Sequence, residues 1–64
     1  MKLRINKLIY ALVWYPSGKI RNITYNKDTI LDVAKITGEG NSEYSIDFKN
    51  GSRVVLSSDC FSVV

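Results

Sequence analysis

Two short segments of this 64-residue chain share a pattern that is typical of a β-hairpin loop. Residues 15–19 and 48–52 each place an aromatic residue, turn-forming residues and a glycine between runs rich in β-branched and aromatic residues. In a three-residue hairpin loop, a type I turn is followed by a residue in the left-handed conformation, which glycine adopts without strain. We therefore expect two antiparallel hairpins, with Gly18 and Gly51 at positive φ.

The length of the first loop determines which residues face each other across the first hairpin. Pro16 presets the turn, and a three-residue loop places Tyr15 opposite Lys19. The cross-strand pairs that follow are Val13 with Arg21, Ala11 with Ile23, and Ile9 with Tyr25.

In the second hairpin, the sorting of polar and apolar residues selects the register. A two-residue Asn50-Gly51 turn would place Phe48 opposite Arg53 and mix the two faces. A three-residue loop instead places Asp47 opposite Arg53 on a solvated face. We expect this register, in which Tyr44, Ile46, Phe48, Val54 and Leu56 form the apolar face.

Residues 28–37 fit either a strand or a short helix. Asp28 or Thr29 would cap the helix and Gly38 would end it. We favour the strand, because the segment is short for a helix and rich in β-branched residues. The strand would place Ile30, Ala34 and Ile36 on one face, and Leu31 and Val33 on the other. Residues 38–41 would form a loop and residues 60–64 a short final strand.

These elements predict an all-β fold and a single small domain spanning residues 1–64. The expected form is a five- or six-stranded curled sheet or partly open SH3-like barrel built from two hairpins. The alternative is an α+β fold with one short helix at residues 28–37.

The C-terminal part of the chain carries a resemblance at the level of the fold. A strand from Tyr44, a glycine turn, a strand to Leu56, a tight Ser58-Asp59 turn and a final strand at 61–64 follow one another. This order resembles the last strands of SH3-like barrels such as Tudor or Sm modules. The pattern is generic, so the resemblance implies a fold and no function.

The composition offers no covalent or metal staple for a domain of this size. The chain has one Cys and no His, so it supplies neither an intramolecular disulfide nor the usual ligands of a structural zinc site. Domains this small have a limited core and marginal stability. We therefore expect a homodimer, formed through strand edges or through the face that carries Tyr10 and Trp14.

Catalysis is difficult to assemble from these residues. Without His, the commonest general base and the partner of a nucleophilic Cys or Ser are missing. Cys60 lies beside Phe61 in an apolar run, where a small buried hydrophobic residue is expected. Asp28 and Asp32 alone would form a weak cation site. We expect no enzymatic activity, no metal and no cofactor.

The first strands have two apolar faces. Alternation turns Leu3, Ile5, Ile9, Ala11 and Val13 towards a core, which leaves Leu8, Tyr10, Leu12 and Trp14 on the opposite face. Either another part of the chain covers this second face, or it forms an exposed patch of the kind that marks a partner site. Our leading hypothesis is a non-enzymatic binding module that occupies a surface of another protein. Its apolar anchors are Tyr10, Leu12 and Trp14, and Lys19 and Arg21 steer it towards an acidic protein partner.

Such small chains without His look like the single-domain inhibitors and adaptors encoded by phages and mobile elements. The longest nearly apolar run, residues 8–15, is too short to span a membrane as a helix. The basic start imitates a weak signal peptide, but Trp14, Tyr15 and Pro16 stand where small residues would precede cleavage. We expect a cytoplasmic protein that has no membrane partner.

Charge is distributed unevenly along the chain. Residues 1–27 carry six basic and no acidic residues, whereas residues 28–64 carry three basic and six acidic residues. The two halves either pair with each other or leave a basic face for an acidic partner. The basic face supports a second hypothesis, a nucleic-acid-binding module of SH3-like or OB-like type. Its contact residues would be Arg4, Lys7, Lys19, Arg21, Lys27 and Tyr25. A third hypothesis is a small oligomer that sequesters a nucleotide-like anion.

Overall fold

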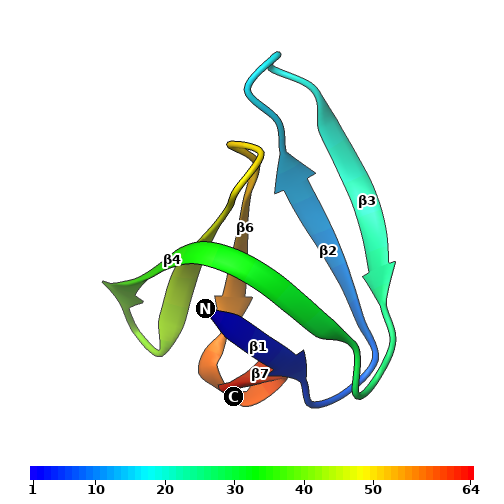
Figure 1. Ribbon diagram of the computed structural model, residues 1–64, viewed down its shortest axis with the longest axis vertical. Helices are drawn as coiled ribbons and strands as arrows, with labels where there is room; N and C mark the ends of the chain where they lie inside the picture. The colour runs from blue at the N-terminus through cyan, green and yellow to red at the C-terminus, as the bar shows by residue number, and fades with distance from the viewer.

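The computed structural model describes all residues 1–64 and is built from strands joined by short turns (Figure 1). The strands are β1 (Lys2–Ile5), β2 (Ile9–Trp14), β3 (Ile20–Tyr25), β4 (Ile30–Gly40), β5 (Glu43–Phe48), β6 (Arg53–Ser57) and β7 (Phe61–Val63). A 3₁₀ turn, η1 (Ser58–Cys60), precedes β7 and contains Cys60, which we had expected in the final strand. The all-β prediction is confirmed. The helix alternative at residues 28–37 is wrong, because β4 occupies that segment.

The strands form one antiparallel sheet of seven strands, one more than the upper expected number, in the order β3-β2-β6-β5-β4-β1-β7. The two end strands, β3 and β7, each have one free edge, so the curled sheet stays open. In Figure 1, β4 arches across the molecule, with β1 and β7 below it and the β2–β3 hairpin to one side. This arrangement is compatible with a small curled sheet or a partly open barrel.

A bulge in β4 corrects the two faces that we predicted for this segment. The register shifts between Val33 and Lys35, so Ala34 is an extra residue in the ladder with β5. A bulge of one residue reverses the in-and-out alternation beyond it. Val33 is therefore fully buried and Ile36 also packs against the core, although strict alternation would place them on opposite faces.

Both predicted hairpin registers are confirmed. In the first hairpin, Val13 lies opposite Arg21, and the backbone N–H of Tyr15 donates to the carbonyl of Lys19 at 2.9 Å. In the second hairpin, Asp47 lies opposite Arg53, and their side chains form a 2.7 Å ion pair. The loop glycines have the expected positive φ, +89° at Gly18 and +88° at Gly51.

The predicted loop at residues 38–41 is wrong in extent. Strand β4 continues to Gly40, and the turn is reduced to Asn41 and Ser42. These two residues have φ values of 51° and 63°. A two-residue turn with both residues left-handed matches the twist of its flanking strands. The ladder therefore extends to this short turn and includes the pairs Gly38 with Tyr44 and Gly40 with Glu43.

The core lies inside the curl of the sheet. Its buried members are Leu3, Ile5, Ile9, Ala11, Val13, Val33, Ile46, Val54, Leu56 and Phe61. The list contains every residue of the first strands that alternation predicted to point inward. The ring of Tyr44 packs edge-to-face on Phe61 with centroids 5.7 Å apart, which joins the second hairpin to the C-terminal strand.

Candidate functional site

The outer face of β2 is apolar and open to solvent. Tyr10 is 77% exposed and Trp14 is 43% exposed, and Leu8 and Leu12 are about half exposed. Cross-strand pairing places Ile20, also exposed, beside Trp14 on the same face. Each of these side chains keeps at least 43% of its surface exposed. Of the two sequence alternatives for this face, the structure shows the exposed one.

A groove opens beside this face because β2 and β6 diverge. The two strands pair only where Val13 meets Val54 and Trp14 meets Arg53. Residues 9–12 and 55–57 therefore have no strand neighbour across the gap. The groove has a volume of about 480 Å³. It is lined by Leu8, Ile9, Tyr10, Ala11, Leu12, Trp14, Glu43, Val55, Leu56, Ser57 and Cys60.

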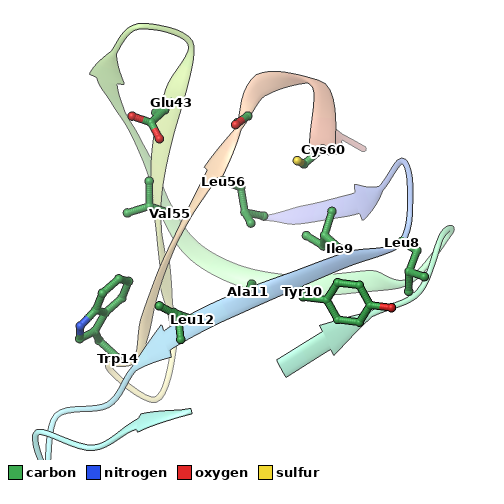
Figure 2. A pocket seen from close by; sticks show the side chains of 11 residues that line it. Leu8, Ile9, Tyr10, Ala11, Leu12, Trp14, Glu43, Val55, Leu56 and Cys60 are labelled. Carbon is green, nitrogen blue, oxygen red and sulfur yellow. The ribbon is translucent and has the colours of Figure 1, made fainter. Parts of the chain in front are cut away.

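The two walls and the ends of the groove are visible in Figure 2. Trp14 and Leu12 lie near one end, and Leu8 and Cys60 lie near the other. Glu43 is the one charged side chain in the lining, and it forms no salt bridge. The groove thus offers an apolar surface with a single free carboxylate at its edge.

Sequence reasoning missed the second wall of this groove. Val55 is exposed and occupies an outward position in the second hairpin, where its register partner is Ser45. The predicted register already implied this outward position. No local sequence pattern predicts that β6 pairs with β2, and this pairing brings Val55 and Cys60 to the same groove. Cys60 is half-buried there, instead of being a fully buried hydrophobic residue.

The two steering cations lie on the other face of the first hairpin. Arg21 pairs with Val13, and Lys19 faces Tyr15 across the loop. Side chains of paired residues project to the same face of a sheet, and neighbours along a strand project to opposite faces. The structure therefore brings Tyr10, Leu12 and Trp14 together and separates Lys19 and Arg21 from them.

A second hollow, of about 320 Å³, lies on the side of Val13. Its lining residues are Val13, Tyr15, Tyr25, Asp32, Phe48, Lys49, Asn50 and Ser52. Burial raises the pKa of the Tyr25 phenol, and the nearby Tyr15 phenol raises it further. At the rim, Lys49 Nζ lies 2.9 Å from a carboxylate oxygen of Asp32. The hydrogen bond from Lys49 is the main reason why the pKa of Asp32 is below its ordinary value.

The residues of the nucleic-acid hypothesis are only partly brought together. Lys19, Arg21 and Tyr25 project to one face of the first hairpin. Arg4 lies on β1 opposite Ser62, in another part of the sheet, and Lys27 lies in the turn before β4. Lys7 is bound to Asp59, with Nζ 2.7 Å from the carboxylate. It is the only basic side chain of residues 1–27 in a salt bridge, so pairing with the acidic half leaves most of the basic charge free.

Comparison with family profiles, characterised proteins and solved structures finds no match for this chain. No helix in the structure has the length and apolar character needed to cross a membrane. No group of three or more potential metal-ligating side chains is clustered.

Proposed function

We propose that this protein is a non-enzymatic binding module, a small inhibitor or adaptor that occupies a surface of another protein. The observation that supports this proposal is the row of exposed apolar side chains on β2, with Tyr10 and Trp14 as its aromatic members. Contiguous exposed apolar surface is typical of interaction sites, and Trp and Tyr are enriched among the residues that contribute most to binding. The groove beside the row adds depth for an inserted side chain.

Charge favours a partner that is acidic overall. The chain carries a net charge of +3, and Lys19 and Arg21 have no ionic partner. Net charge acts on the encounter over long range, so these cations accelerate approach although they lie away from the contact face. At the contact itself, the free carboxylate of Glu43 favours a basic side chain of the partner.

The proposal also includes a cellular location, an origin and a competing second copy of the chain. We place the module in the cytoplasm and infer an origin in a phage or mobile element, where small single-domain inhibitors are common. The open seven-stranded sheet is compatible with a partly open barrel, and residues 44–64 resemble the last strands of SH3-like barrels. A second copy of the chain competes for the same face, because a two-fold arrangement buries the same residues on both sides.

Site-specific crosslinking tests this proposal. A photo-crosslinking residue at Tyr10 is expected to capture one protein from a lysate of the native host. Excess unlabelled chain should compete with this capture, and Trp14→Lys should abolish it. The matched control is Val63→Lys, because Val63 is an exposed apolar residue on β7 that does not line the groove. Equal loss in both variants, or crosslinks to nothing but a second copy, would contradict the proposal.

A further inference from the structure

The hollow beside Tyr25 gathers aromatic rings from three segments of the chain. Tyr15 follows β2, Tyr25 ends β3 and Phe48 ends β5. All three rings pack against the core while remaining partly exposed. The volume of about 320 Å³ is in the range that small-molecule sites occupy. Half-buried rings held in this way are rigid platforms on which a planar heterocycle can stack.

Two free cations lie outside the lining of the hollow, on the strand positions opposite two of its lining residues. Lys19 faces Tyr15, and Arg21 pairs with Val13; both of these partners line the hollow. Cross-strand partners on one face have Cβ atoms only about 4.5–5.5 Å apart, so both cations are within reach of a ligand in the hollow. Lys19 and Arg21 are exposed and form no salt bridge.

The hollow is also lined by polar residues, which include Asp32, Lys49 and Asn50. Lys49 is already paired with Asp32, so these residues offer no free positive charge. The Asp32 carboxylate lies 2.9 Å from Lys49 Nζ and 3.8 Å from the N-terminal ammonium, so its charge is neutralised. The unpaired basic side chains that can attract a phosphate on the other side of the hollow are Lys19 and Arg21. Asn50 Oδ1 accepts hydrogen bonds from the N–H and hydroxyl of Ser52, which leaves the Asn50 amide N–H groups to donate to a ligand edge.

We propose that this hollow binds a nucleotide unit, with the base on Tyr15 and Tyr25 and the phosphate on Lys19 and Arg21. The same chemistry is present in a free nucleotide and in a single-stranded nucleic acid. The site lies on the opposite face of the hairpin from Trp14, so it is independent of the proposed protein contact.

NMR titration of the full chain tests the proposal with four probes: AMP, adenosine, inorganic phosphate and the oligonucleotide dT8. We expect AMP to shift the ring resonances of Tyr15 and Tyr25, and adenosine or phosphate alone to bind more weakly. In low salt, Lys19→Gln/Arg21→Gln should weaken AMP binding by about tenfold, because two phosphate contacts are lost. The control Arg4→Gln/Lys35→Gln removes the same charge and should retain binding within about twofold. Neither residue lines the hollow, and neither do their cross-strand partners Ile30, Ser62 and Asp47.

The comparison of AMP with dT8 separates the two sources of the ligand. Similar affinity for both identifies a free-nucleotide site, and clearly tighter, salt-sensitive binding of dT8 identifies a single-strand site. The proposal is overturned if no probe shifts Tyr15 and Tyr25, or if both double variants lose binding equally. Trp14→Lys should leave this binding intact, which distinguishes failure here from failure of the protein-binding proposal.

Discussion

The two hairpins have the same loop geometry but different outer faces. In the β5–β6 hairpin, the outward residues near both ends are polar or charged, as in the Asp47–Arg53 pair. In the β2–β3 hairpin, the outward positions of β2 hold Tyr10, Leu12 and Trp14. Both hairpins bury their inward residues in the same core. The outer face of β2 is therefore the more apolar of the two, since Val55 is the only apolar residue among the outward positions of the β5–β6 hairpin. This difference is the reason why we propose the outer face of β2 as a partner site.

The first hairpin also pairs with fewer neighbouring strands than the second. The β5–β6 hairpin has strands on both sides, whereas β3 is an edge strand and β2 meets β6 at only two residue pairs. The second hairpin is also tied to β4 by the Lys49–Asp32 ion pair, and residues 9–25 contain no salt bridge. The first hairpin is therefore the less constrained of the two. It contributes one side of each proposed binding surface, and residues of the β5–β6 hairpin contribute the other.

Truncation to Ala should destabilise the fold most at inward residues and little at outward residues. Ile46 is 0% exposed, so Ile46→Ala should lower the free energy of unfolding by about 2–5 kcal/mol through lost burial and a cavity. Leu12 is 47% exposed, so Leu12→Ala should cost less than about 1 kcal/mol. Denaturant unfolding measures both values. A large loss for Leu12→Ala would mean that the outer face of β2 contributes to the fold.

A second prediction separates the two loop glycines. Val at either position must adopt a left-handed φ, which costs more than about 1 kcal/mol. Gly51→Val should be worse than Gly18→Val, because a Cβ at Gly51 would lie 2.9 Å from Pro16 Cγ, whereas nothing lies within 4 Å at Gly18. Thermal unfolding of each variant provides the comparison. Adding Pro16→Ala should rescue part of the loss at Gly51 and none at Gly18; equal losses without rescue would refute the contact between the loops.

The sequence predicted local features well and long-range ones poorly. Both registers followed from loop length and the sorting of faces, since a shift of one residue would expose Ile46 or Val13. The bulge at Ala34 was missed, because strict alternation was assumed through residues 30–36. The groove depends on where β2 separates from β6, which no local pattern encodes.

One error was avoidable from the sequence. The predicted pairing of Arg21 with Val13 already placed Arg21 on the inward side of the hairpin, away from Trp14. Grouping Lys19 and Arg21 with the outer aromatic residues ignored this parity. The nucleic-acid hypothesis combined the same cations with Tyr25, and these three residues lie on a single face. The hypothesis also included Arg4, which lies in another part of the sheet.

Acid should slightly weaken the ion pair between Asp32 and Lys49. Asp32 has a pKa below its ordinary value because Lys49 donates a hydrogen bond to it, so the folded state binds this proton less readily than the unfolded state. The resulting stabilisation is present at neutral pH and is lost as pH falls through the depressed pKa. Amide exchange at residues 48–52 should rise slightly in acid, relative to residues 15–19, after correction for intrinsic rates. Asp32→Asn should remove this pH dependence; an unchanged dependence would assign it to other carboxylates.

The proposed function requires that the outer face of β2 is open and available to a partner. Trp14 is the only Trp of the chain and lies on this face, so its fluorescence directly reports the solvent exposure of the face. The measurement is acrylamide quenching of Trp14 emission in the free protein at low micromolar concentration. We predict the red-shifted emission of a hydrated indole and efficient quenching. Blue-shifted emission that acrylamide quenches weakly would show that the face is covered and is not available to a partner.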